Sequence, residues 1–216
     1  MSLDLDALSI SSANGTALFE PLTLHVPAGE VVTVMGPSGV GKSTLLDAIG
    51  GHLAHGFRLA GKVRLNGRDV TGLPAEARRI GLMFQDALLF PHLSVGDNLA
   101  FGLPPGLRGG AHRRAAVEEA LSQAGLTGLY ERDPATLSGG QRARAALMRT
   151  LLAEPAALLL DEPFSKLDAE LREDMRRFTF DHVMSQAVPT LMVTHDPDDA
   201  SAAGGPVVAL KGLLAP

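Results

Sequence analysis

Cysteine is absent from this chain of 216 residues. The protein therefore has no disulfide, no thiolate metal ligand and no thiol nucleophile, and this composition is compatible with a reducing compartment. Seven histidines are present. His52 and His55 stand close enough to share a helix face, but no third ligand is nearby in the sequence, so we interpret them as solvated side chains.

Long apolar runs and excess positive charge are also missing. Hydrophobic residues make up 45% of the chain, yet no stretch approaches the roughly 20 apolar residues of a membrane helix. The first eight residues are acidic, where a secretory signal would place a basic end and a long apolar run. We therefore expect a cytoplasmic protein that does not span a bilayer by itself. The net charge of −5 argues against a general nucleic-acid binder.

The length suits one compact unit with an inserted lobe. Strand signals disappear between Gln85 and Ser138, where clusters of Pro and Gly interrupt otherwise helical sequence. A helical subdomain is the expected structure of this insertion. The expected organisation is a single domain over residues 1–216, with a core and an antiparallel β subdomain in 1–84 and 142–216 and a helical subdomain in 85–141.

Hydrophobic patterning predicts an α/β fold. Apolar and polar residues alternate over residues 18–26, and Asn66-Gly67 marks a turn after 63–65, which indicates an antiparallel sheet on the N-terminal side. Short apolar runs that indicate buried parallel strands occupy residues 31–35, 157–160 and 190–193. Helices are expected at residues 42–49, 111–124, 140–153 and 169–186, with a short strand after the turn at 201–206. Alternating strands and helices imply a parallel sheet.

A glycine-rich segment follows the first of these apolar runs and leads into a predicted helix. This context fits the phosphate-binding P-loop, in which backbone N–H groups and a helix N-terminus converge on a phosphate. Lys42 is expected to reach the β- and γ-phosphates, Ser43 to ligate Mg²⁺ and Thr44 to support the site. The strand–loop–helix setting disfavours an accidental turn. The residues expected to bind ATP here are Gly36, Pro37, Ser38, Gly39, Val40, Gly41, Lys42, Ser43 and Thr44.

Two carboxylates, Asp161 and Glu162, follow the apolar run at 157–160. Ligands of α/β proteins collect at this edge of the sheet. Asp161 is expected to hold Mg²⁺, and Glu162 to accept a proton from the water that attacks the γ-phosphate. A solvated acidic pair is the alternative, and the accompanying P-loop makes it the weaker one.

The rest of the chain has to distinguish among P-loop proteins, since kinases, GTPases and motors share that loop. Leu137-Ser-Gly-Gly-Gln141, followed by Arg142, resembles the signature motif of ABC ATPases. Ser138, Gly139 and Gly140 would open a helix and could present donors to an anion. The resemblance implies that Ser138, Gly139, Gly140 and Gln141 contact the γ-phosphate held by a partner subunit.

Other segments resemble the same family, in its order and at its spacings, over residues 3–210. Gln85 resembles the glutamine that senses Mg²⁺ and the attacking water, although alone it would be read as a surface residue. Residues 165–168, ending in Asp168, resemble the loop that crosses between the two ATPase subunits. His195 resembles the switch histidine that contacts the γ-phosphate, whereas alone it would be read as structural.

The segment 84–99 is similar to importer ATPases for polyamine, iron, sulfate, molybdate and thiamine. In that family it forms a groove for a coupling helix of the membrane subunit. Phe90, Pro91 and Leu93 would supply apolar contacts, with core packing as the alternative interpretation.

The resemblance implies that this protein is an ATP-hydrolysing, Mg²⁺-dependent importer subunit at the cytoplasmic face of the inner membrane. Implied partners are membrane permease subunits, a second ATPase copy that closes around two ATP molecules, and an extracytoplasmic solute-binding protein, with no nucleic acid. A non-transport ABC ATPase and a small-molecule kinase are the rivals. The kinase gives no account of residues 137–141.

This chain departs from the family at three places. The aromatic residue expected to stack on adenine is absent from residues 11–16, and Phe19 is interpreted as core. Lys166 stands where the family often has Ala. The chain stops soon after His195, so no regulatory domain is expected.

Overall fold

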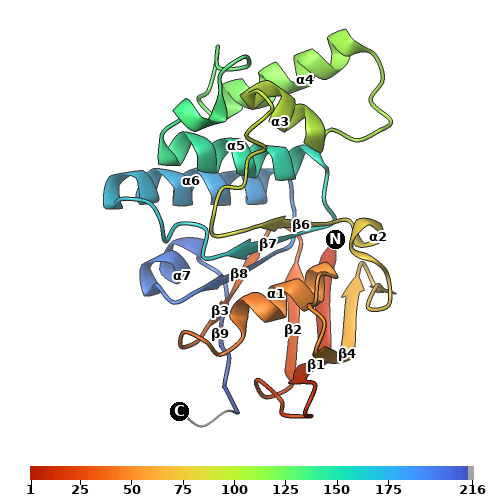
Figure 1. Ribbon diagram of the computed structural model, residues 1–216. Helices are drawn as coiled ribbons and strands as arrows, with labels where there is room; N and C mark the ends of the chain where they lie inside the picture. Colours follow the sequence, from red (N-terminus) through yellow and green to blue (C-terminus); the bar gives the residue numbers. More distant parts are fainter. Residues whose placement is uncertain (214–216) are drawn as a thin grey trace. The chain divides into compact units, whose positions relative to one another are not determined.

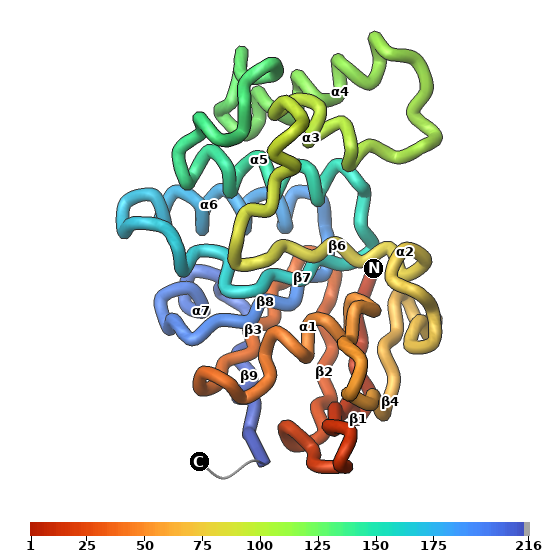
Figure 2. The backbone as a smooth tube through the Cα atoms, in the orientation of Figure 1, coloured from red at the N-terminus to blue at the C-terminus, as the bar shows by residue number. Residues whose placement is uncertain are grey.

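The computed structural model describes residues 1–213 and contains two compact units (Figure 1). Unit 1 contains residues 1–82, 156–162 and 180 onward, and unit 2 contains 83–155 and 163–179. The backbone therefore enters unit 2 twice and returns to unit 1 twice, as Figure 2 allows the reader to follow. Within the described residues, no helix combines the length and the apolar character that crossing a membrane requires.

An antiparallel sheet with the order β2-β1-β4-β5 forms one part of unit 1. Its strands are β1 (Ser2–Ser12), β2 (Leu22–Pro27), β4 (Phe57–Leu65) and β5 (Arg68–Asp69). The predicted strand at 18–26 begins only at Leu22, since Phe19 makes just an isolated bridge to Gly212. The sequence prediction also missed β1. Its alternation is broken at Ala7, where both neighbouring strands shift register.

The bulge at Ala7 requires a glycine opposite it. Ala7 has a φ of 45° and Gly61 on β4 has a φ of 89°. A Cβ atom on Gly61 would lie 2.5 Å from the carbonyl oxygen of Ala7, closer than van der Waals radii allow. Glycine lets the two strands stay paired through the bulge.

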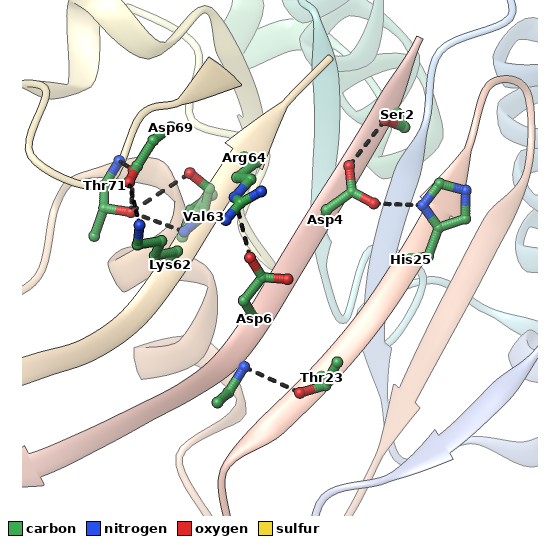
Figure 3. Close-up of polar contacts among 11 residues, drawn as sticks. Ser2, Asp4, Asp6, Thr23, His25, Lys62, Val63, Arg64, Asp69 and Thr71 are labelled. Carbon is green, nitrogen blue, oxygen red and sulfur yellow. Dashed lines mark hydrogen bonds and ion pairs between the residues drawn. The ribbon is translucent and has the colours of Figure 1, made fainter. Parts of the chain in front are cut away.

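Charged side chains line the polar face of this sheet (Figure 3). Asp4 pairs with His25, and Asp6 accepts from Arg64 at 3.0 Å. Burial alone would raise the pKa of Asp4, but hydrogen bonds from His25 and Ser2 lower it below its ordinary value. Cross-strand pairs of opposite charge of this kind stabilise strand pairing and help to fix the register.

A five-stranded sheet with the order β6-β7-β8-β3-β9 completes the core. Its strands are β6 (Ile80–Met83), β7 (Ala157–Asp161), β8 (Thr190–Thr194), β3 (Val31–Met35) and β9 (Val207–Ala209). The pairs β3–β8, β7–β8 and β3–β9 are parallel. The three apolar runs and the last short strand are therefore confirmed, as is the α/β fold class. Nearly all residues of β3, β7 and β8 are buried, which explains their continuous hydrophobicity.

Among the described residues, the helices that lie wholly within unit 1 are α1 (Lys42–Gly50), α2 (Ala75–Arg78) and α7 (Pro197–Ala203). The sequence predicted α1 but neither α2 nor α7. These two are short, so their helical periodicity is too brief to recognise.

Unit 2 is helical. It contains α3 (Val95–Gly102), α4 (Gly110–Gln123), the 3₁₀ turn Pro134–Thr136, α5 (Gly139–Leu152) and most of α6 (Ala169–Ser185). The predictions for α4, α5 and α6 are confirmed within one residue at each end, whereas α3 was not predicted. Gly102 lets α3 approach α5 closely, since a Cβ atom there would lie 2.1 Å from the carbonyl oxygen of Arg149.

Candidate functional site

The P-loop of unit 1 joins the end of β3 to the start of α1. Gly39 and Gly41 have φ values of 81° and 103°, which an L side chain would strain. Gly41 also stands at the N-cap of α1. A cavity of about 300 Å³ opens against this loop. Its lining residues are Ser38, Gly39, Gly41, Lys42, Ser43, Thr44 and Glu162. Backbone donors and a helix N-terminus around a polar cavity form a cradle for a phosphate.

Lys42 is buried, with 7% of its surface exposed. Its side chain turns back so that the ammonium group contacts the P-loop backbone. Its Nζ atom donates to the carbonyl oxygens of Gly36 at 2.9 Å and Pro37 at 3.2 Å. The same atom lies 3.9 Å from Oε1 of Glu162. A buried cation held by carbonyl groups beside the cavity can exchange them for phosphate oxygens.

Asp161 ends β7 and faces the start of α1. Burial raises the pKa of its carboxyl above the ordinary value, and the charges of Glu162 and Asp47 act in the same direction. A hydrogen bond with Ser43 and the charge of Lys42 oppose this rise. When burial destabilises the charged form of a carboxylate, a nearby cation stabilises that form. Asp161 and the Ser43 hydroxyl supply the oxygen ligands that Mg²⁺ prefers, so these residues fit that ion when it arrives with nucleotide phosphates.

Glu162 is held in an unusual conformation beside Asp161. Its φ of 43° is left-handed, and its backbone N–H donates to the carbonyl oxygen of Val193 at 2.9 Å. Its Oε1 atom lies 3.0 Å from Nδ1 of His195. The structure thus brings together Lys42, Glu162 and His195, which come from three separate segments of unit 1. Strained backbone of this kind often accompanies function.

Arg78 of α2 is a buried residue that the sequence analysis did not single out. It is 6% exposed, and its guanidinium donates to carbonyl oxygens of Ala48 at 2.9 Å and Ile49 at 2.8 Å. Further donors reach Thr71 at 2.6 Å and Leu73 at 2.9 Å. Carbonyl groups at a helix C-terminus lack helical partners. Arg78 therefore anchors the far end of the P-loop helix, and nothing in its sequence context distinguishes it from a surface arginine.

Gln85 lies in unit 2, where its Nε2 atom donates to the hydroxyl of Ser165 at 3.1 Å. The next residues along both segments, Asp86 and Lys166, form an exposed ion pair. Lys166 stands where the family often has Ala, and its ion pair with Asp86 connects the two loops of unit 2. The role of Gln85 at Mg²⁺ stays a prediction.

The signature segment forms the N-terminus of α5 in unit 2. Ser138 and Gln141 make a reciprocal capping box, in which Gln141 N donates to Ser138 Oγ at 3.2 Å and Ser138 N donates to Gln141 Oε1 at 3.0 Å. Ser138 and Gly139 are exposed, whereas Gly140 is buried against Leu171. The helix N-terminus is thus presented at the surface of unit 2, and the contact of these residues with a nucleotide stays a prediction.

Asp168 stands just before α6, where its Oδ1 atom accepts from Leu171 N at 3.0 Å. It is exposed, and its assignment to an intersubunit loop stays a prediction. Phe19 is fully buried and belongs to the core of unit 1, as expected. Across residues 1–213, no group of three or more His, Asp or Glu side chains is arranged to hold a metal.

A family model described as ABC transporter matches residues 19–165 of the chain. The protein belongs to the ABC transporter family. The uncharacterized ABC transporter ATP-binding protein YnjD of Escherichia coli is 54% identical over 86% of this chain and 85% of its own length. The thiamine import ATP-binding protein ThiQ of Cereibacter sphaeroides is 48% identical over 80% of this chain and 74% of its own length.

Solved structures of ATP-binding cassette proteins share the fold. CbiO1 from Clostridium perfringens, part of an ABC transporter complex, is 26% identical with a TM-score of 0.85, covering 98% of this chain and 86% of its own. A dimeric ATP-binding cassette in a post-hydrolysis state with ADP and Pi is 29% identical with a TM-score of 0.80, covering 97% and 94%. The predicted family, fold and ATPase class are thus confirmed, and the names of the ABC transporter relatives favour an importer over a non-transport ATPase.

Proposed function

We propose that this chain is the ATP-hydrolysing subunit of a membrane importer for a small solute. The observation that carries the proposal is the convergence of Lys42, Glu162 and His195 at the P-loop cavity. Relatives named as importers of thiamine, sulfate and Fe³⁺ support the transport assignment.

Each residue has a chemical task at this site. The P-loop N–H groups and Lys42 bind the phosphates of ATP, where they offset the negative charge. Glu162 accepts a proton from the attacking water, and His195 beside it orients the carboxylate through Oε1. Mg²⁺ held by Ser43 and Asp161 would neutralise charge on the β- and γ-phosphates.

A second copy of the chain is the proposed ATPase partner. The exposed signature residues Ser138 and Gly139 stand at a helix N-terminus that attracts anions. In the proposed dimer, this helix of one copy faces the γ-phosphate bound by the P-loop of the other copy. Two ATP molecules would therefore hold the pair together, and their hydrolysis would release it.

An aromatic cluster in unit 2 supports the proposed contact with permease subunits. Phe101 on α3 is 69% exposed, and its ring packs edge-on against Phe90 with centroids 4.8 Å apart. The Arg149 guanidinium lies over the Phe90 ring, 5.2 Å from its centroid. An exposed phenylalanine that packs on a half-buried one beside an arginine is typical of interface anchors. We expect the apolar side of a permease helix to dock here, at the cytoplasmic face of the membrane.

The ATPase part of the proposal can be tested with Lys42→Ala. Loss of the ammonium should abolish ATP binding in a fluorescent-nucleotide titration and reduce phosphate release to background. Lys211→Ala is the matched control, because Lys211 is exposed on the same unit. Equal ATP turnover by the wild-type protein and Lys42→Ala would contradict the proposal.

The transport part requires the native host. The tagged protein would be extracted from membranes in mild detergent, and its partners identified by mass spectrometry. Copurifying multi-spanning permease subunits, with or without an extracytoplasmic solute-binding protein, would support the importer. Recovery of soluble or nucleic-acid partners alone, from a preparation that still hydrolyses ATP, would leave the ATPase and exclude the importer.

A further inference from the structure

His195 lies in a very short link between two elements of unit 1. Strand β8 ends at Thr194, and α7 begins at Pro197, so only His195 and Asp196 join them. The His195 side chain is 55% exposed, and the ion-pair contact of its ring is with Glu162. Few packing contacts can restrain an imidazole exposed to this extent, so its direction depends on how the chain leaves β8.

A buried polar network surrounds that link. Thr194 and Asp199 are each 1% exposed, and the Thr194 hydroxyl donates to Oδ2 of Asp199 at 3.0 Å. The same hydroxyl accepts from the backbone N–H of Asp196 at 3.0 Å. One hydroxyl thus connects the end of β8, the first turn of α7 and the residue that follows His195.

This network is not needed to begin α7, because another residue caps that helix. The Asp196 side chain accepts from Asp198 N at 2.9 Å, and Pro197 occupies the first turn. Burying a carboxylate is unfavourable unless its hydrogen bonds compensate. The buried contact of Asp199 with Thr194 therefore adds a constraint that capping alone does not supply.

We propose that Thr194 and Asp199 are positioning residues that hold His195 against Glu162. The proposal rests on the proposed ATPase function of the same site. Asp199 fixes the Thr194 hydroxyl, and that hydroxyl fixes the position of the Asp196 amide. The backbone of His195, which lies between Thr194 and Asp196, therefore has little freedom. His195 is thereby placed before nucleotide binds.

Thr194→Val tests this directly, because valine keeps the shape of threonine and lacks its hydroxyl. We expect kcat for ATP hydrolysis to fall about tenfold or more, since small misplacements of a reacting group are costly. ATP binding and KM should change by less than about twofold, because the P-loop is untouched. Thr194→Ser restores the hydroxyl and should restore most of the activity.

A double variant tests whether Thr194 affects ATP hydrolysis through His195. His195→Ala alone should lower kcat, and adding Thr194→Val to it should lower kcat by less than about twofold further. An equal loss from Thr194→Val in both backgrounds would overturn the proposal, since the hydroxyl would then act without His195. Full activity of a folded Thr194→Val protein would overturn it as well.

A spectroscopic readout needs no activity. In ¹⁵N-histidine NMR spectra of the neutral ring, the contact with Glu162 should hold His195 in the tautomer protonated at Nδ1. In Thr194→Val, and in Asp199→Asn if the valine protein does not fold, we expect a shift toward the solvent-like Nε2 tautomer. Ring shifts identical to wild type in a folded variant would overturn the proposal.

The two proposals fail in different ways. Turnover by the wild-type protein no higher than by Lys42→Ala would exclude the ATPase function, whatever the NMR spectra show. Turnover that depends on Lys42 and Glu162, but not on Thr194 or Asp199, would keep the ATPase and exclude the positioning role.

Discussion

Glu162 and His195 meet because β7 and β8 run parallel and in register. Asp161 pairs with Val193, so the residues that follow on the two strands emerge side by side at the same edge of the sheet. The backbone N–H of Glu162 donates to the Val193 carbonyl, and Oε1 of Glu162 then lies 3.0 Å from Nδ1 of His195. Sheet register thus brings a carboxylate and an imidazole together from two distant segments.

Glu162→Gln should separate ATP binding from hydrolysis. Glutamine keeps the size of the side chain but cannot act as a base, so kcat should fall roughly a hundredfold or more while ATP affinity stays similar. The ATP-bound dimer should then accumulate in Mg-ATP, which light scattering would detect. Glu20→Gln, at an exposed position, should behave as wild type. A monomer throughout would count against the proposed dimer.

Asp161→Asn should make the nucleotide-free protein more stable at neutral pH. The pKa of Asp161 is raised in the folded state, mainly by burial, so its stability contribution falls as pH rises from the unfolded pKa through the folded value. Asparagine mimics the protonated form and avoids this loss. Thermal unfolding should show a higher Tm for the variant at pH 7.5, with the difference shrinking toward pH 4. ATP turnover should be lost, and a lower Tm at pH 7.5 would refute the burial argument.

Arg78→Met should destabilise unit 1 through the far end of the P-loop helix. Methionine leaves carbonyl groups of Ala48 and Ile49 without their guanidinium donors. Losing several buried hydrogen bonds should lower the free energy of unfolding by about 3 kcal/mol or more. Urea unfolding followed by circular dichroism would measure this. Arg68→Met is the control at an exposed position, and a change of less than about 0.5 kcal/mol is expected there.

Gly139 and Gly140 should respond oppositely to alanine. A Cβ atom on Gly140 would lie 2.3 Å from Leu171 Cδ1, whereas one on Gly139 would have its nearest neighbour at 3.9 Å. Gly140→Ala should therefore lower the Tm, since overpacking outweighs the gain of about 1 kcal/mol in helix propensity. Gly139→Ala should keep or raise the Tm, and yet reduce ATP turnover if that exposed surface meets the nucleotide of a second copy. Equal Tm changes would contradict the packing argument.

The sequence by itself determined the family, the α/β class and the strand–loop–helix context of Lys42. Those conclusions depend on local signals, namely continuous apolar runs, glycine spacing and short motifs, which need no partner from elsewhere in the chain. The same local signals placed β3, β7, β8 and α1. They failed for β1, whose alternation is interrupted by the bulge at Ala7, and for the short helices α2 and α7.

Only the tertiary structure decided how residues from separate segments act on one another. Register between β7 and β8 sets Glu162 beside His195, and a buried arginine from α2 anchors the helix that begins at Lys42. Burial and pairing of this kind arise from the packed chain as a whole, so no local stretch of sequence could reveal them.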